Sequence, residues 1–362
     1  MRVLVTGGAG YIGSHTLKAL INAGHNPVVL DNLVYGHENV VKNILKVPLI
    51  VDQVGNKEIL KQILLGQHTS LKNTTHENKI IEAVLHFAAY AYVGESVENP
   101  LKYYRNNVIE STILLETLCD PNITQHTNNN SPIPIVFSST CATYGTPKDV
   151  PITENTPQAP INPYGKSKYF IENIIKDLSY SSGLRGVILR YFNAAGAIPD
   201  SSFGELHEPE THLIPLVIQA ALGVRENIKI FGNDYDTPDG TCIRDYIHVC
   251  DLADAHVKAL DLFSNNEESQ NHCSSKSDER CFIFNLGNGN GVSVKEVINT
   301  VIEITGKKIN IINAPRRPGD PAILIASSEK IKSILDWQPK YPSIAQIVND
   351  AYKWHKKIYE KI

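Results

Sequence analysis

The chain has 362 residues, of which 42% are hydrophobic and 20% charged, with a formal net charge of −4. At about 150 residues per domain this length predicts one large domain or two fused ones. The composition excludes a disordered chain and a collagen-like scaffold. A sequence pI of about 6.4 argues against proteins that bind nucleic acid or acidic membranes through a basic surface. We therefore expect small-molecule partners.

The N-terminal segment lacks the charged and apolar regions of a signal peptide, and no apolar run approaches the ~20 residues that span a bilayer. The cysteines form no Cys-x-x-Cys pair; they are Cys119, Cys141, Cys242, Cys250, Cys273 and Cys281. In a chain of this size this pattern indicates free thiols in a reducing cytosol, so we expect a cytoplasmic protein. The histidines show no His-x-x-x-His spacing, and no metal site is expected.

Strand and helix patterns alternate along the first half of the chain. Short β-branched runs predict buried strands at residues 2–6, 27–31, 83–87, 133–138 and 185–190. Helical periodicity lies between them at residues 14–23, 100–118 and 163–180. This alternation predicts an α/β fold with a doubly wound, Rossmann-type parallel sheet and right-handed crossovers.

The second half of the chain has sparser strands and more Pro and Gly. We expect residues 1–192 to form the Rossmann domain and residues 193–362 a smaller α+β lobe. Segments around 243–260 and 282–287 are expected to return to the first domain. Polar stretches at residues 66–79, 121–132 and 264–280 are interpreted as surface loops inserted between elements, because they bury too little apolar area to order themselves.

A glycine-rich segment, TGGAGYIG, directly follows the first predicted strand and precedes a helix. Gly7, Gly10 and Gly13 allow a tight turn, close approach of a pyrophosphate and close packing of helix on strand. Asp31 ends the second strand, where a carboxylate accepts a hydrogen bond from a ribose 2′-hydroxyl and repels a 2′-phosphate. No arginine follows it directly. The segment therefore predicts binding of NAD in preference to NADP.

Tyr164 and Lys168 are four residues apart in a predicted helix, so they share one face. A nearby ammonium and a positively charged nicotinamide together are expected to lower the pKa of Tyr164 from about 10 to about 7, making it a general base. The hydroxyls of Ser138, Ser139 and Thr140 lie at the carboxyl end of a strand, where open α/β sheets bind ligands. The alternatives without function are that Tyr164 and Lys168 lie on a solvated helix face, and that the three hydroxyls cap a helix or a turn.

In this order and spacing, the motifs resemble the extended short-chain dehydrogenase/reductase family and, within it, the nucleotide-sugar 4-epimerases. Further segments carry the resemblance, at residues 7–15 (GGAGYIGSH), 86–89 (HFAA), 93–96 (VGES), 189–193 (LRYFN), 230–234 (IFGND), 244–248 (RDYIH) and 314–320 (APRRPGD). The resemblance implies NAD-dependent interconversion of UDP-glucose and UDP-galactose by inversion at C4, through a transient 4-keto intermediate. It also implies a homodimer, paired through the helices at 100–118 and 163–180.

The resemblance implies roles residue by residue. Thr140, Tyr164 and Lys168 match the catalytic triad. Positions that contact the cofactor are Gly7, Gly10, Tyr11, Ile12, Gly13, Asp31, Asn32, Asp52, Phe87, Ala88, Asn106, Lys168 and Tyr191. Positions that contact the substrate are Thr140, Tyr164, Asn193, His212, Leu213, Phe231, Arg244, Arg317 and Asp320. Two arginines from distant segments suit a pyrophosphate, and Asp320 suits ribose hydroxyls.

Alternative substrates and functions remain open at this point. Leu324 replaces a tyrosine that lines the hexose pocket in some members, which predicts room for UDP-GlcNAc and UDP-GalNAc. Residues 87–92 and 139–143 also resemble UDP-arabinose 4-epimerases, so UDP-arabinose and UDP-xylose are the alternative pair. A nucleotide-sugar 4,6-dehydratase needs an acidic pair after the active-site threonine, where this chain has Cys141 and Ala142. A non-catalytic NAD sensor is expected to lack Tyr164 or Lys168.

Overall fold

The computed structural model describes residues 1–264, 280–317 and 320–360. Its larger sheet has seven parallel strands in the order β3-β2-β1-β4-β5-β6-β10. These strands are β1 (Arg2–Thr6), β2 (Asn26–Asp31), β3 (Leu49–Val51), β4 (Ala83–His86), β5 (Ile135–Thr140), β6 (Gly186–Tyr191) and β10 (Cys281–Leu286). The predicted Rossmann-type α/β fold is confirmed, and the five predicted strands agree within two residues at each end.

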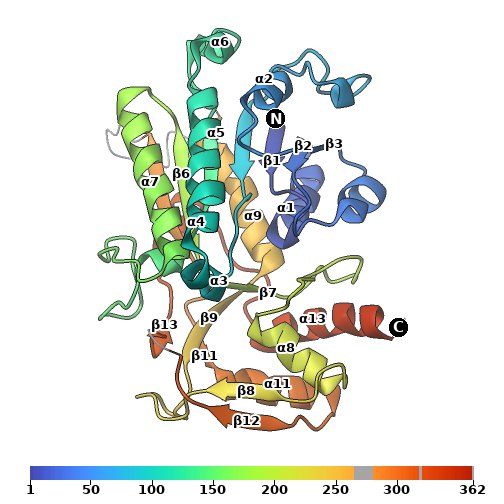
Figure 1. Cartoon of the computed structure of the whole chain (residues 1–362), viewed down its shortest axis with the longest axis vertical. Helices are drawn as coiled ribbons and strands as arrows, with labels where there is room; N and C mark the ends of the chain where they lie inside the picture. The colour runs from blue at the N-terminus through green and yellow to red at the C-terminus, as the bar shows by residue number, and fades with distance from the viewer. Residues whose placement is uncertain (265–279, 318–319, 361–362) are drawn as a thin grey trace.

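Helices cover both faces of this sheet, in the upper part of Figure 1. Along β1, Val3 and Val5 pack with α1 and α9, whereas Leu4 packs with α2, α5 and α7. Alternate residues of a strand point to opposite faces, so a strand between two helical layers is apolar throughout. The α-helices among the described residues are α1 (Tyr11–Asn22), α2 (Lys57–Leu64), α3 (Val93–Glu98), α4 (Pro100–Tyr103), α5 (Glu110–Leu118), α6 (Pro121–Thr124), α7 (Pro163–Ser181), α8 (Leu213–Ala221), α9 (Val249–Ala259), α11 (Val294–Thr305), α12 (Glu329–Leu335) and α13 (Ile344–Tyr359).

The helix predicted at residues 100–118 is interrupted. A π-helical segment, η3 (Tyr104–Ile109), joins α4 to α5 and carries Asn106 and Asn107. π-Helical turns are rare and frequently occur at functional sites. Apolar periodicity does not reveal one, because a single wide turn leaves the surrounding pattern almost unchanged.

The second lobe, in the lower part of Figure 1, contains two smaller sheets. Its strands are β7 (Asn193–Ala195), β8 (Ile228–Phe231), β9 (Ile243–His248), β11 (Gly291–Ser293), β12 (Ile311–Ala314) and β13 (Ile323–Leu324). Strand β9 pairs with β7, β11 and β13, and β8 pairs with β12. Helices α8, α11 and α13 pack with these sheets around one apolar core.

The expectation for residues 243–260 needs a correction. Helix α9 packs against the large sheet, in the same core as α1. Strand β9 belongs to the smaller sheet, because its backbone hydrogen bonds go to β7, β11 and β13. The segment therefore crosses from the second lobe to the first, and β10 continues the large sheet.

The polar stretches at residues 66–79 and 121–132 contain short helical turns. The first contains a 3₁₀ turn, η2 (Thr69–Leu71), and the second contains α6. Leu71 and Ile123 are fully buried in the same core as α2 and α5. One apolar side chain anchors each otherwise polar segment. Of the third stretch, residues 265–279 lie outside the described residues.

Among the described residues, none of the helices combines the length and the apolar character needed to cross a bilayer. Cys119, Cys141, Cys242 and Cys250 are free thiols.

We expect Ile123→Ala to lower the free energy of unfolding by about 2–4 kcal/mol, because it removes a fully buried side chain and leaves a cavity. Gln125→Ala, at an exposed position of the same segment, is the control and should change stability by less than about 0.5 kcal/mol. Urea denaturation measures both. Equal stability of the two variants would contradict the anchoring role of Ile123.

Candidate active site

The backbone of the glycine turn between β1 and α1 is packed tightly against neighbouring backbone atoms. Gly7 has a φ of +72°, and a Cβ there would lie 2.5 Å from the Ala88 nitrogen. A Cβ on Gly13 would lie 2.3 Å from the Gly7 carbonyl oxygen. Gly10 is the N-cap of α1 and provides no side-chain cap. The first N–H groups of a helix have no partner within the helix, so Tyr11 and Ile12 begin an anion-binding terminus beside the turn.

Asp31 lies beside this turn at the end of β2 and is 7% exposed. Its two carboxylate oxygens accept hydrogen bonds from the Ala9 nitrogen at 2.9 Å and the Leu33 nitrogen at 2.8 Å. Burial raises the pKa of Asp31, and these two hydrogen bonds oppose that rise. Asp52 follows the neighbouring strand β3, and its nitrogen donates to the Asp31 carbonyl at 3.2 Å. Asn32, next to Asp31, is exposed. The structure therefore places Asp31, Asn32 and Asp52 at one edge of the sheet.

Helix α7 positions the predicted tyrosine and lysine. It begins after Asn162, whose side chain accepts a hydrogen bond from the Gly165 nitrogen at 2.8 Å. Tyr164 and Lys168 lie in its first two turns and are 8% and 4% exposed. Thr140, at the end of β5, hydrogen-bonds Tyr164.

The Lys168 ammonium is held against strand β5. Its Nζ donates to the Ser138 carbonyl at 2.8 Å and lies 4.9 Å from the centre of the Phe137 ring. Both contacts fix the position of the ammonium without neutralising its charge. The structure thus brings Thr140, Tyr164 and Lys168 together at the carboxyl end of β5.

Burial opposes ionisation of both side chains. It raises the pKa of Tyr164 well above the usual value of a tyrosine, and the neighbouring Tyr191 raises it further. Burial also lowers the pKa of Lys168 to about 7, despite the opposing charge of Glu172. The protein groups alone therefore do not lower the Tyr164 pKa, because desolvation acts against both charged forms. The expected lowering, which includes the charge of a nicotinamide, stays a prediction.

A buried polar network behind the triad was not predicted from the sequence. Arg190 of β6 binds both carboxylate oxygens of Glu172, with distances of 2.6–3.2 Å, and both side chains are almost fully buried. Glu172 also accepts a hydrogen bond from Ser139, and Arg190 donates to the Tyr144 hydroxyl at 2.9 Å. The network joins α7 to β5 and β6 beside Thr140. The only sequence signal is that Glu172 lies one turn after Lys168.

The remaining predicted cofactor positions lie directly after β4, on η3 and on β6. The ring of Phe87 packs against His256 at 4.7 Å, and the Tyr191 and Ser138 hydroxyls share a hydrogen bond. The Asn106 amide donates to Asn107 at 2.9 Å. These strand ends and the π-helical segment flank Lys168 and the glycine turn.

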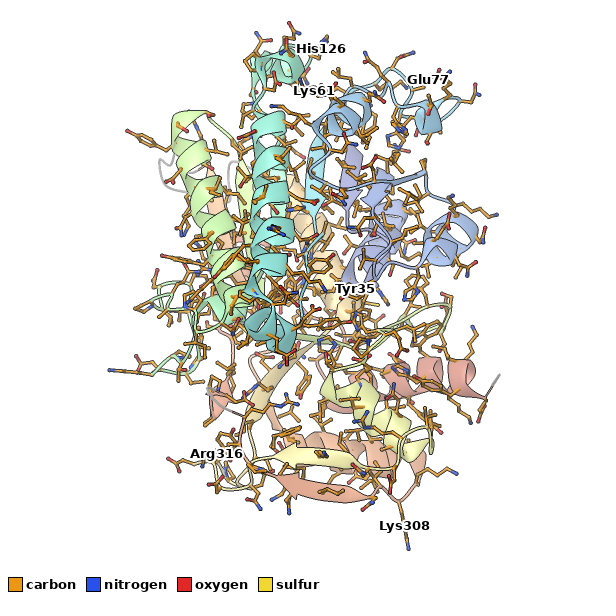
Figure 2. The ribbon with its side chains drawn as sticks, viewed as in Figure 1. Tyr35, Lys61, Glu77, His126, Lys308 and Arg316 are labelled. Atoms are coloured by element: carbon orange, nitrogen blue, oxygen red, sulfur yellow. The ribbon has the colours of Figure 1, made fainter. Side chains whose placement is uncertain are left out.

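Tyr35, Tyr90 and Tyr92 form a cluster of aromatic rings that sequence reasoning missed. The Tyr35 ring centre lies 5.7 Å from that of Tyr90 and 5.3 Å from that of Tyr92. Lys102 lies over the Tyr90 ring at 4.4 Å. Figure 2 shows Tyr35 near the boundary between the two lobes. Isolated tyrosines in a polar segment gave no signal for this cluster.

The predicted substrate residues of the second lobe form two groups. Arg244 of β9 forms an ion pair with Asp320, so these side chains face each other. The guanidinium of Arg317 lies 4.1 Å above the Phe231 ring. Arg244 also acts electrostatically on the thiol of Cys141, the neighbour of Thr140. Strand β9 therefore brings Arg244 close enough to act on Cys141, which follows Thr140.

Three further predicted substrate positions lie on β7 and at the start of α8. Asn193 begins β7 and pairs with Tyr246 of β9. Leu213 begins α8, and His212 is its N-cap. The Nδ1 atom of His212 faces the carboxylates of Glu205 and Glu210, so this nitrogen is already engaged within the protein. Sequence reasoning missed these two carboxylates because their spacing matches no usual template.

Comparisons with known proteins agree with this geometry. The family described as GDP-mannose 4,6 dehydratase matches residues 4–351. The UDP-glucose 4-epimerase of Halalkalibacterium halodurans is 47% identical over 357 residues, which cover 99% of this chain and 96% of that protein. The chain belongs to the UDP-glucose 4-epimerase family. This family lies within the extended short-chain dehydrogenases/reductases.

Solved structures of this epimerase family are similar over the full chain. The UDP-glucose 4-epimerase of Brucella ovis in complex with NAD is 40% identical, with a TM-score of 0.83 and 97% of each chain covered. The enzyme of Bifidobacterium longum in complex with NAD+ and UDP is 34% identical, with a TM-score of 0.83 and 100% of each chain covered.

We expect Glu172→Gln to lower the free energy of unfolding by about 3 kcal/mol, because the Arg190 charge would remain buried without its partner. Glu116→Gln is the control, since Glu116 forms only an exposed pair with Lys57 at 4.0 Å and should contribute less than about 1 kcal/mol. Chemical denaturation measures both. A Glu172→Gln variant as stable as the control would contradict the assigned role of the pair.

Proposed function

We propose that this chain interconverts UDP-glucose and UDP-galactose by NAD-dependent inversion at C4. The observation that carries the proposal is the arrangement of Thr140, Tyr164 and Lys168 beside a glycine turn at one edge of the sheet. The 47% identity to a UDP-glucose 4-epimerase over nearly the whole chain supports the same activity.

The residues of the first lobe fit NAD. Gly7 and Gly13 leave no space for a side chain, so backbone N–H groups of the turn can approach a pyrophosphate. Each carboxylate oxygen of Asp31 that accepts a backbone N–H retains acceptor capacity for a ribose hydroxyl. When bound, NAD would accept a hydride from C4, return it to the opposite face, and add a positive charge beside Tyr164.

Within this proposal Tyr164 removes the proton from the 4-hydroxyl and returns it after the sugar has turned. Thr140 donates a hydrogen bond to Tyr164 and thereby lowers the tyrosine pKa. The Lys168 ammonium is fixed by Ser138 and Phe137 on the same face of α7. Because burial raises the pKa of Tyr164, the base acts efficiently only when a positive charge lies beside it.

The second lobe would hold the UDP part of the substrate. Arg317, which lies above the Phe231 ring, can contact a phosphate or a base. Arg244 and Asp320 carry a positive and a negative charge near Thr140. The sugar must turn over while UDP stays bound, so binding energy belongs on UDP. Leu324 lies in β13 opposite Arg244. Its small side chain leads us to propose that N-acetylated hexoses are also accepted.

A 4,6-dehydratase, the activity that gives the matched family its description, is the second candidate. That chemistry requires an acid and a base at C5 and C6 of the sugar. Cys141 and Ala142 occupy the positions after Thr140, and burial raises the pKa of the Cys141 thiol to about 12. This residue pair therefore favours epimerisation.

We further propose that the chain acts in the cytoplasm, in galactose metabolism, as a homodimer. The free thiols of Cys119, Cys141, Cys242 and Cys250 suit a reducing compartment. Leu101, Ile109 and Phe170 are 61%, 54% and 46% exposed on α4, η3 and α7. Helix α4 and segment η3 both pack against α7, so these apolar side chains can share one interface.

Purified protein should convert UDP-galactose to UDP-glucose without added NAD, because the cofactor is regenerated in every cycle. Chromatography of the products tests this, with UDP-N-acetylgalactosamine and UDP-xylose as parallel substrates. Conversion of UDP-xylose alone would favour the pentose alternative. Formation of a dehydrated 4-keto-6-deoxy sugar, or consumption of NAD in proportion to substrate, would contradict the proposal.

Tyr164→Phe should lower kcat by about 10²–10⁴-fold, the range expected for removal of a general base. Tyr180→Phe on the same helix is the control, since Tyr180 is 93% exposed and should retain full activity. Steady-state kinetics with UDP-galactose measures both. Full activity of Tyr164→Phe would refute the assignment.

Phe170→Glu should convert the homodimer to a monomer, because it places a charge in the proposed apolar interface. Val224→Glu, at an exposed apolar position of the second lobe, should leave the dimer intact. Sedimentation velocity distinguishes the two states. A wild-type monomer, or a Phe170→Glu dimer, would contradict this interface.

A further inference from the structure

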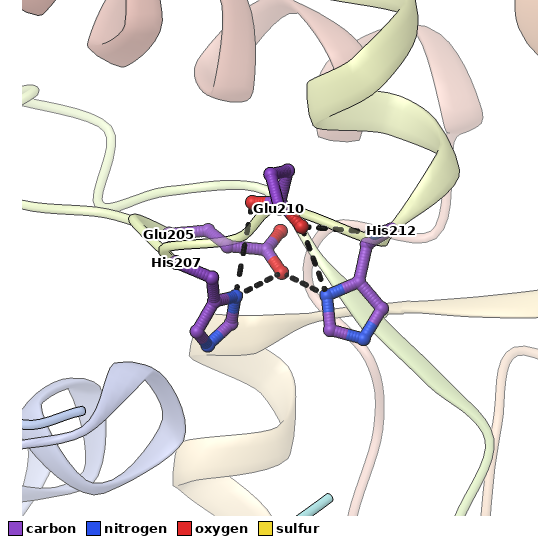
Figure 3. A group of neighbouring side chains, drawn as sticks. All are labelled: Glu205, His207, Glu210 and His212. Atoms are coloured by element: carbon purple, nitrogen blue, oxygen red, sulfur yellow. Dashed lines mark hydrogen bonds and ion pairs between the residues drawn. The ribbon is translucent and has the colours of Figure 1, made fainter. Parts of the chain in front are cut away.

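Four metal-ligating side chains converge on the loop between β7 and α8. They are Glu205, His207, Glu210 and His212, and one ligand atom from each lies within 4.8 Å of all the others. Figure 3 shows the two imidazole rings directed at the two carboxylates from opposite sides. The proposed proton and hydride transfers use none of these side chains, and only His212 is also a predicted substrate contact.

Three of four nitrogen–oxygen separations in the cluster are close to those of a tetrahedral metal site, with each Glu210 oxygen facing a different ring. His207 Nδ1 lies 3.3 Å from Glu205 Oε1 and 3.7 Å from Glu210 Oε2, and His212 Nδ1 lies 3.5 Å from Glu210 Oε1. With metal–ligand bonds of about 2.1 Å, the edges of a tetrahedron measure about 3.4 Å. The separation between His212 Nδ1 and Glu205 Oε1, at 2.6 Å, is shorter.

The contacts within the cluster are close but poorly aligned. Glu205 is 2% exposed, and neither its Oε1 nor the buried Nδ1 of His207 has a well-aligned hydrogen-bond partner, although His212 Nδ1 lies 2.6 Å from Glu205 Oε1. A buried carboxylate oxygen and an imidazole nitrogen that both point toward one centre suit a shared cation.

The charges of the cluster also balance around a divalent cation. Two carboxylates and two neutral imidazoles carry a charge of −2, which one M²⁺ ion neutralises. The alternative is two imidazolium rings, since the carboxylates raise the pKa of His207 to about 9 and that of His212 to about 10. The metal-bound state and the doubly protonated state differ in metal content, so a metal analysis distinguishes them.

We propose that Glu205, His207, Glu210 and His212 bind one divalent transition-metal ion of the zinc class, in a structural role. Two imidazole and two carboxylate ligands suit Zn²⁺, which accepts four-coordinate nitrogen and oxygen sites. Magnesium and calcium prefer six or more oxygen ligands. The half-exposed ring of His212 leaves a path for the ion to enter.

The site lies where the loop contacts both lobes. The Leu206 carbonyl contacts His37 Nε2 at 2.9 Å, and the ring of His207 meets that of Tyr11 edge to face at 6.2 Å. In the second lobe, Trp354 of α13 donates to the Glu205 carbonyl at 2.9 Å. A metal would therefore fix the start of α8 relative to the first lobe.

The test is the metal content of the full-length protein, purified without a metal-affinity step, incubated with ZnSO₄ and dialysed. Plasma mass spectrometry should find about one zinc per chain and little in His207→Asn/His212→Asn. His126→Asn should retain the zinc, because His126 is exposed and lies at the far end of the first lobe (Figure 2). Wild-type protein that holds no zinc would overturn the proposal. The cluster would then be two imidazolium rings paired with two carboxylates.

Two further measurements use only the wild-type protein, in case the double variant fails to fold. The chelator 1,10-phenanthroline should lower the melting temperature, whereas the non-chelating 1,7-phenanthroline should not. Titration with Co²⁺ should produce the visible absorption of tetrahedral cobalt and saturate near one equivalent. No chelator effect, or the weak spectrum of hydrated Co²⁺, would also overturn the proposal.

Discussion

The buried ion pair between Glu172 and Arg190 fixes the position on which the candidate chemistry depends. It joins the middle of α7 to β6, while Ser139 joins the same carboxylate to β5. Tyr164 and Lys168 lie one to two turns before Glu172 on the same helix, so their height above the sheet is set by this contact. An exposed pair would allow α7 to shift. A buried pair resists any shift, because movement would leave a charge unpaired away from water.

Burial has opposite consequences for structure and for reactivity in this site. Lys168 and Tyr164 are held rigidly because they are surrounded by protein, yet the same desolvation disfavours the ammonium and the phenolate. The protein groups therefore position the base without activating it. A positively charged cofactor beside Tyr164 is the missing electrostatic element, so the proposed chemistry is coupled to binding of that cofactor.

The sequence predicted β1, β2, β4, β5 and β6 well because these strands are largely buried on both faces and the crossover helices are amphipathic. It missed the short edge strand β3, whose Val51 is exposed. It also predicted the glycine turn and the Tyr-x-x-x-Lys pair, whose chemistry depends on local spacing. It did not predict the π-helical segment that carries Asn106, because one wide turn leaves apolar periodicity intact. The Glu172–Arg190 pair and the Glu205–His212 cluster were missed because they depend on tertiary approach or match no known spacing. Single apolar anchors such as Ile123 were hidden in polar segments.

In the proposed reaction a hydride leaves C4 and returns to the same sugar while UDP stays bound. The direct test is conversion of UDP-galactose labelled with deuterium at C4, in ordinary water and in the presence of unlabelled UDP-galactose. The UDP-glucose formed from labelled molecules should retain deuterium at C4, with no label in the solvent. Loss of deuterium to water, or its transfer to C4 of unlabelled molecules, would refute this reaction.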